Sequence, residues 1–165
     1  MKKFLIVLAL LIGIGTVYEV TRKEKVYSFS DTGLIYGNKN APNRLVIFTS
    51  FQCEKCERFS KAVSGCIREM ISSGDYCIIY KPVNRAFYQN DDCLNLKYDE
   101  LETLYNKPSD SGSIKKENEQ VLSIIEDELE DNNLSVVPVY FYNGIKHSAI
   151  ASSDEFKEVI SEKQF

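Results

Sequence analysis

The sequence predicts a single α/β domain built around a sheet that is covered on both faces. Its 165 residues and 44% hydrophobic content suit one domain with a real core and a short leader. Strand, helix and strand signals follow one another between residues 45 and 83, an order typical of a parallel βαβ unit. The first apolar run, at residues 45–48, has no polar face, which indicates a central strand.

Turn and stop signals delimit this βαβ unit. Residues 37–43 are rich in turn formers and lead into the first strand. An amphipathic helix follows, because apolar side chains recur at three- and four-residue spacing. These are Phe59, Ala62, Val63, Cys66, Ile67, Met70 and Ile71. Gly74 ends the helix, and residues 76–83 form a second strand that a right-handed crossover would place parallel to the first.

The next part of the chain is polar and irregular. Residues 84–115 predict a short insertion, with a helix over residues 98–105 and a loop at residues 107–112. A further amphipathic helix is predicted to end near Asp131. Its apolar face consists of Ile114, Val121, Leu122, Ile125 and Leu129.

A β-hairpin and a helix complete the predicted domain. Residues 136–142 are rich in β-branched and aromatic side chains, and residues 145–150 supply the returning strand. Asn143 and Gly144 between them form the strongest hairpin signal in the chain. Residues 152–155 resemble a capping box, which predicts the start of a final helix.

The N-terminus indicates export. Lys2 and Lys3 precede an apolar run at residues 4–18, the layout of a charged n-region followed by a hydrophobic h-region. The run is short for a free-standing membrane span, which needs about 17 to 25 residues. We therefore expect residues 1–25 to be a cleaved signal peptide or a retained membrane anchor with a short stalk. A soluble buried helix is a third alternative; either of the first two places residues 26–165 outside the cytoplasm.

The charge distribution excludes nucleic acid as a partner. Residues 1–25 contain five basic and two acidic side chains, which leaves 15 basic and 22 acidic side chains in the rest of the chain. Phosphate backbones would repel so acidic a domain, and no basic stripe interleaved with aromatic residues reverses this.

Cys53 and Cys56 are the candidate catalytic pair. They lie where the buried strand gives way to the amphipathic helix, so Cys53 falls at or just before the first helical turn. Unpaired backbone N–H groups and the helix dipole at that place stabilise a thiolate. The two-residue spacing lets the second sulfur reach the first, which predicts a disulfide that opens and closes readily.

Other uses of a Cys-x-x-Cys pair are less well supported. A structural disulfide at the same junction is one alternative. A zinc site would need two further ligands, and the remaining candidates show no second paired spacing: Cys66, Cys77, Cys93 and His147. Haem attachment needs a histidine directly after the second cysteine, where this chain has Glu57. We expect neither a metal nor a cofactor.

Two separated motifs resemble the DsbA-like thioredoxin-fold oxidoreductases. Residues 37–42 (GNKNAP) and 46–56 (VIFTSFQCEKC) are similar to that family's G-N-x-x-A-P turn and F-Q-C-x-x-C strand end. Residues 137–144 (VPVYFYNG) are similar to its second signature, a proline followed by a strand and an N-G hairpin. The resemblance spans about residues 34–160. It implies a bacterial protein with a thioredoxin-like fold and a short helical insertion; the leader adds a preceding N-terminal apolar helix and an extracytoplasmic location.

The resemblance also implies an activity and further site residues. Pro138 would be a cis-proline that faces the disulfide, and Val137 would contact the cysteine pair and a bound client; an ordinary strand-edge proline is the alternative. The implied activity is disulfide exchange with exported protein or peptide thiols, recharged by a membrane oxidase or reductant. A dedicated reductase or isomerase, or a non-catalytic accessory protein that binds a secreted peptide, are the other functions that remain open.

The chain departs from the family pattern close to the cysteines. The family's buried carboxylate six residues before the first cysteine is replaced by Ile47, and the acidic residue three before it by Ser50. Proton transfer to Cys56 must therefore use water or another group. Glu54 should oppose a thiolate at Cys53 and Lys55 should favour it, so we expect a less oxidising couple than in the strongest oxidants.

The remaining candidates have simple structural interpretations. Cys66 and Cys77 fall on apolar faces and are predicted to be core residues. Cys93 lies in the polar insertion and is expected to be more exposed; a structural disulfide from Cys93 to Cys66 or Cys77 stays open. His147 has no ligand-spaced neighbour and is predicted to be a surface strand residue.

Overall fold

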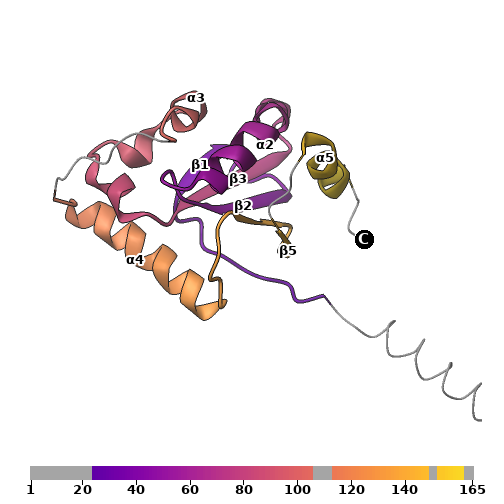
Figure 1. Cartoon of the computed structure of the whole chain (residues 1–165). Coiled ribbons are helices and arrows are strands. Elements are labelled where there is room, and N and C mark those ends of the chain that lie inside the picture. Colours follow the sequence, from indigo (N-terminus) through magenta and orange to yellow (C-terminus); the bar gives the residue numbers. More distant parts are fainter. Residues whose placement is uncertain (1–23, 106–112, 149–151, 162–165) are drawn as a thin grey trace, which may run out of the picture.

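The computed structural model describes residues 24–105, 113–148 and 152–161. This part of the chain forms a five-stranded mixed sheet with strand order β1-β3-β2-β4-β5 and helices on both faces (Figure 1). None of the helices in the described ranges is both long and apolar enough to cross a membrane. The predicted apolar leader lies outside the described residues.

The predicted βαβ unit is confirmed at the centre of the sheet. β2 (Asn43–Thr49) is the middle strand, and β3 (Tyr76–Pro82) runs parallel to it. α2 (Glu54–Ser73) connects them and ends at Gly74, whose φ of 76° favours glycine. Its buried face consists of Cys56, Phe59, Ser60, Val63, Cys66, Ile67 and Met70. This long helix fixes the end of β2, where both candidate cysteines lie.

The hairpin is confirmed at one edge of the sheet. β4 (Val139–Tyr142) and β5 (Ile145–Ser148) are antiparallel, and β4 also pairs with β2. Asn143 and Gly144 join them with φ values of 48° and 82°, as a type I′ turn requires. β4 begins later than predicted, because Pro138 lacks an N–H group for the ladder.

A short strand was missing from the sequence-based prediction. β1 (Leu34–Gly37) pairs antiparallel with β3 at the other edge of the sheet. Four residues at an edge are too few to display a clear hydrophobic alternation.

The segment between β3 and β4 is more helical than predicted. It contains η1 (Arg85–Gln89), η2 (Cys93–Asn95), α3 (Tyr98–Glu102) and α4 (Lys116–Asp131). α3 ends three residues before the predicted boundary at residue 105, and Ile114 precedes α4 rather than lying on its face. The loop predicted at residues 107–112 falls outside the described residues.

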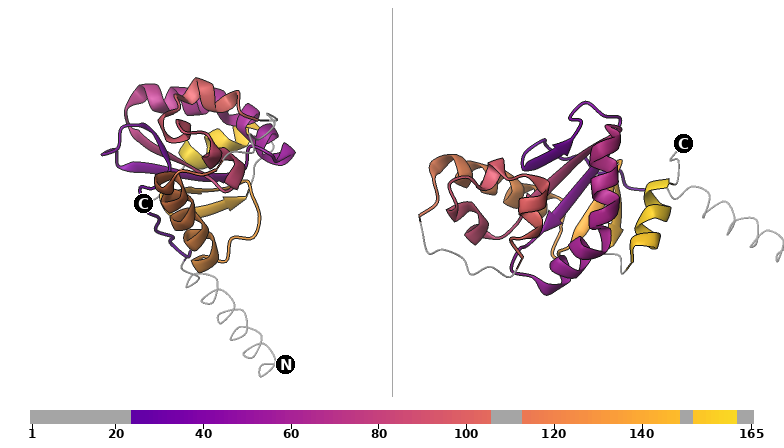
Figure 2. Two further views of the ribbon diagram at one scale, coloured as in Figure 1. Left: turned by 90° about the vertical axis from the view of Figure 1, so that its left-hand side faces the viewer. Right: turned by 90° about the horizontal axis from the view of Figure 1, so that it is seen from above.

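Different elements cover the two faces of the sheet (Figure 2). On one face, α2 packs beside α5 (Ser153–Ser161), and Phe59, Tyr140 and Phe156 form an aromatic cluster between them. On the other face, Phe29 packs against Phe48 and Phe141. Successive residues of a strand point to opposite faces, so β2 directs Ile47 and Thr49 towards α2 and Phe48 away from it.

Candidate active site

Cys53 caps α2 at its N-terminus. Its backbone is extended, its N–H donates to the Ser50 carbonyl at 3.2 Å, and its carbonyl accepts the Glu57 N–H at 3.0 Å. The chain thus turns from β2 into α2 within residues 50–52, and the Cys53 sulfur lies beside the unpaired N–H groups of the first helical turn. Cys53 is partly exposed, whereas Cys56 is 0% exposed. Only the first sulfur of the pair is therefore open to a large reactant.

The surroundings of Cys53 favour its thiolate. Burial alone would raise the pKa of the thiol, but hydrogen bonds from the Cys56 backbone, the Cys56 side chain and the Lys55 backbone outweigh it. With the positive charge of Lys55, they lower the pKa from its ordinary value of 9.0. Glu54 and Lys55 are both exposed, and the Glu54 carboxylate lies 3.7 Å from Arg58.

Cys56 is held as a thiol. Burial raises its pKa to about 12, although the Ser50 backbone N–H donates to its sulfur at 3.4 Å and so partly stabilises the anion. The two sulfurs are in hydrogen-bond contact, and their pKa values are shifted in opposite directions from the ordinary value. In a pair of this kind, the first thiol ionises readily to a nucleophilic thiolate, whereas the second stays protonated.

A cluster of hydroxyl groups surrounds the buried sulfur. The Thr49 hydroxyl hydrogen-bonds with Cys56 and lies 3.1 Å from the Tyr105 hydroxyl, which in turn hydrogen-bonds with Ser60. Thr49 and Ser60 are buried, and Tyr105 is partly exposed. None of the three was predicted from the sequence, because no local pattern connects Tyr105 with a threonine 56 residues earlier.

The position below the pair is apolar. Ile47 is 0% exposed on the α2 face of β2, where the family pattern has a carboxylate. The buried charges lie on the opposite face: the Lys81 ammonium is 2.6 Å from the Glu128 carboxylate of α4 and donates to the Thr32 carbonyl at 2.8 Å. Neither charge belongs to the hydroxyl cluster.

The Val137–Pro138 peptide bond is cis. The β2–β4 register pairs Phe48 with Val139, and continuing it by one position brings Pro138 level with Thr49, at the end of β2 that leads to the cysteines. Val137 is partly exposed. The contacts of Val137 and Pro138 with a client remain a prediction.

The other cysteines are buried structural residues. All five cysteines are free thiols, so the structural disulfide considered between Cys93 and Cys66 or Cys77 is not formed in this structure. The expectation that Cys93 is exposed was wrong: it is 0% exposed. η1 packs against α4, where the buried Asn118 amide donates to the Tyr88 and Asn90 carbonyls, and η2 packs against η1.

His147 and the sheet's groove stand apart from the site. His147 is partly buried and stacks on Tyr140, with ring centroids 5.1 Å apart, so it is less exposed than predicted.

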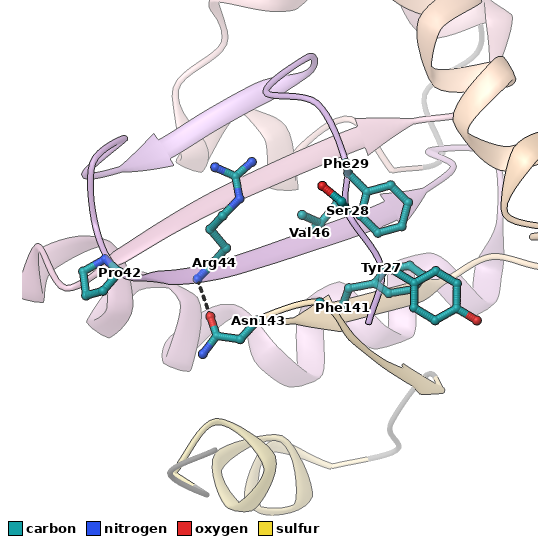
Figure 3. Close-up of a pocket in the computed structure, with 9 residues that line it drawn as sticks. Tyr27, Ser28, Phe29, Pro42, Arg44, Val46, Phe141 and Asn143 are labelled. Atoms are coloured by element: carbon teal, nitrogen blue, oxygen red, sulfur yellow. Dashed lines mark hydrogen bonds between the residues drawn. The ribbon is translucent and has the colours of Figure 1, made fainter. Parts of the chain in front are cut away.

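A groove of about 300 Å³ lies on the sheet face away from α2, and Phe141, Val46 and Arg44 are among its lining residues (Figure 3). It contains none of the candidate site residues. Within the described ranges, no group of three or more His, Cys, Asp or Glu side chains could hold a metal ion.

Comparisons with known proteins support the fold. Residues 30–96 match a family model described as thioredoxin, and a comparison with curated proteins gives no match. Oxidised BdbD from Bacillus subtilis is similar over 86% of this chain and 98% of its own, with a TM-score of 0.64 and 18% identity. A periplasmic thioredoxin-like protein from Salmonella enterica serovar Typhimurium is similar over 81% and 91%, with a TM-score of 0.62 and 12% identity. Chlamydia trachomatis DsbA is similar over 85% and 95%, with a TM-score of 0.51 and 16% identity.

These matches agree with the resemblance carried by the two sequence motifs. The family model covers β1, β2, α2 and β3, together with both cysteines of the pair. The similarity to BdbD and to Chlamydia trachomatis DsbA extends over 85% or more of this chain, well beyond the residues that the family model matches. The chain has a thioredoxin-like fold of the kind found in DsbA-like proteins.

Proposed function

We propose that this protein is an extracytoplasmic thiol-disulfide oxidoreductase that exchanges disulfides with exported protein or peptide thiols. The observation that carries the proposal is the asymmetry of the pair. Cys53 is accessible and has a lowered pKa, whereas Cys56 is buried and has a raised pKa. Thiolates, not thiols, are the nucleophiles in disulfide exchange, so this asymmetry assigns the attack to Cys53.

The exchange has two steps. The Cys53 thiolate attacks one sulfur of a client disulfide, forms a mixed disulfide and releases the other client sulfur as a thiolate. Cys56 then loses its proton and attacks the Cys53 sulfur, which forms the Cys53–Cys56 disulfide and releases the second client thiolate. Run in reverse, the same steps oxidise two client thiols.

The setting of the protein is part of the proposal. The charged and apolar N-terminus supports export, and two of the similar structures are a periplasmic protein and a DsbA. We expect Val137 and Pro138 to contact the client chain, and a membrane oxidase or reductant to recharge the pair. A measured potential near about −270 mV would indicate a reductase or isomerase instead of an oxidase.

A trapping experiment tests the activity. Replacing Cys56 with Ala should leave clients bound to Cys53 as mixed disulfides, because the resolving thiol is gone. The control is Cys66→Ala, which removes a buried thiol outside the pair. Clients captured only by the Cys56→Ala variant, together with insulin reduction or peptide oxidation by the wild type, would support the proposal. Equal capture by both variants and no turnover would refute it.

One observation favours a second function. Ile47 is fully buried where DsbA-like proteins carry a carboxylate, and α4 presents acidic side chains in its first turn. A non-catalytic accessory protein could use such a helix to bind a basic secreted peptide, with Cys53 and Cys56 joined in a permanent structural disulfide. The turnover assays separate the two functions, since a protein with a permanent structural disulfide would catalyse no exchange.

A further inference from the structure

The second step of the proposed exchange requires the buried Cys56 thiol to lose its proton. The thiol is completely buried, and burial raises its pKa to about 12, so it must lose a proton before it can attack Cys53. The side chain at position 47, which could have accepted that proton as a carboxylate, is an isoleucine. The proton therefore needs another route to solvent.

The hydroxyl cluster offers such a route. Thr49 is in hydrogen-bond contact with Cys56, and its oxygen lies 3.1 Å from the Tyr105 oxygen. Hydroxyl groups donate and accept at once, so each can pass a proton while taking one from its neighbour. Thr49 is buried, whereas Tyr105 is partly exposed, so Tyr105 is the one of these two side chains with access to solvent.

The side chains around the hydroxyl cluster are largely apolar. Phe51 packs on Tyr105 with ring centroids 4.9 Å apart, and Phe87 packs on Phe51. A valine would fill the space of Thr49 and keep the apolar contacts, because the two side chains have nearly the same shape. The hydroxyls are thus buried beside a reacting sulfur, in a place that packing alone would fill with methyl groups.

We propose that Thr49 and Tyr105 form a hydroxyl relay that carries the proton of Cys56 to solvent as Cys56 attacks the mixed disulfide. This inference rests on the proposed exchange activity and adds the residues that serve its resolving step. As the new S–S bond forms, the Cys56 proton passes to the Thr49 oxygen, the Thr49 proton passes to the Tyr105 oxygen, and the Tyr105 proton passes to water. The bond between Cys53 and the client sulfur breaks, and that sulfur leaves with the electron pair.

The relay predicts a particular pH dependence. The titratable groups that face Cys56 are Cys53 and Tyr105. In the mixed disulfide Cys53 carries no proton, and burial raises the pKa of Tyr105 to about 12, so neither ionises between pH 7 and 9. With the relay the resolving rate should change little over this range. Without it hydroxide must remove the proton, and the rate should rise about tenfold per pH unit.

Reaction with dithiobis(nitrobenzoate) separates the two steps by stopped-flow absorbance. Cys53 releases the first thionitrobenzoate at a rate that depends on reagent concentration, and Cys56 releases the second at a rate that does not. Thr49→Val should slow the second phase by about 10²-fold at pH 7, and Tyr105→Phe by about tenfold, the range of a lost proton-transfer group. Thr49→Ser, which keeps the hydroxyl, should restore the rate to within about threefold of the wild type.

Tyr36→Phe is the matched control, since it removes a tyrosine hydroxyl that bonds the distant Leu96 carbonyl at 3.0 Å. It should leave both phases unchanged. A second phase that slows equally in Thr49→Val and Thr49→Ser, or that keeps the wild-type pH profile in Thr49→Val and Tyr105→Phe, would overturn the relay. Absence of the first phase in the wild type would instead count against the exchange activity itself.

Discussion

The two faces of the sheet next to the cysteine pair bury different kinds of polar group. On the α2 face, Thr49 and Ser60 are neutral hydroxyls in contact with Cys56 or Tyr105. On the opposite face, the buried Lys81 forms an ion pair 2.6 Å long with the partly buried Glu128, and the Ser30 N–H donates to the same carboxylate at 2.7 Å. Lys81 is 0% exposed, and its ammonium also lies 5.9 Å from the centre of the Phe48 ring.

The buried charges and the cysteine pair thus lie on different faces of the sheet. Burial lowers the pKa of Lys81, while Glu128 opposes that shift, so the pair holds α4 against the sheet as a charged contact. The sulfurs are adjusted instead by backbone N–H groups, hydroxyls and the start of α2. With Ile47 below the pair, the pKa values of Cys53 and Cys56 are still shifted in opposite directions.

The largest expected effect comes from breaking the ion pair. Glu128→Leu leaves the Lys81 ammonium buried without its counter-ion, which should lower the free energy of unfolding by about 3 to 5 kcal/mol in urea titrations. The double variant Lys81→Met with Glu128→Leu should recover most of that loss, because no charge is left unpaired. The alkylation rate of Cys53 should stay unchanged in the double variant. A changed rate would show that the two faces are not independent.

A smaller effect is expected on the α2 face, in the alkylation rates of Cys53 and Cys56. Because the pKa of Cys53 lies below 9.0, its alkylation by iodoacetamide should rise with pH and level off with a midpoint below that value. Cys56 should still be unreactive there, since its pKa is raised to about 12. Mass-spectrometric mapping of the modified cysteine assigns the rates. A midpoint above 9.0 for Cys53, or faster reaction at Cys56, would contradict the asymmetry.

Local sequence patterns predicted the elements that hold the cysteines. The apolar run of β2, the periodic face of α2 and the Asn143-Gly144 turn each carry their signal within a few neighbouring residues. The place of Cys53 at the start of α2 followed from these alone. The cis bond before Pro138 was implied only by the family resemblance, and the structure contains it.

Contacts between distant parts of the chain could not be predicted in this way. Thr49 meets Tyr105 only because the segment after β3 folds back over α2, and nothing local to either residue signals the contact. Cys93 was expected to be exposed because its neighbours in the sequence are polar, but η2 packs against η1 and Cys93 is buried. The Lys81–Glu128 pair was missed for the same reason, since tertiary packing brings the two residues together.

Redox titration of the purified protein in glutathione buffers, followed by non-reducing peptide mapping, tests the central claim most directly. We expect one disulfide, between Cys53 and Cys56, that forms and reopens reversibly at a potential more negative than the value of about −120 mV found for the strongest oxidants. Failure to form that disulfide at any glutathione ratio, or a disulfide that glutathione never reduces, would contradict it.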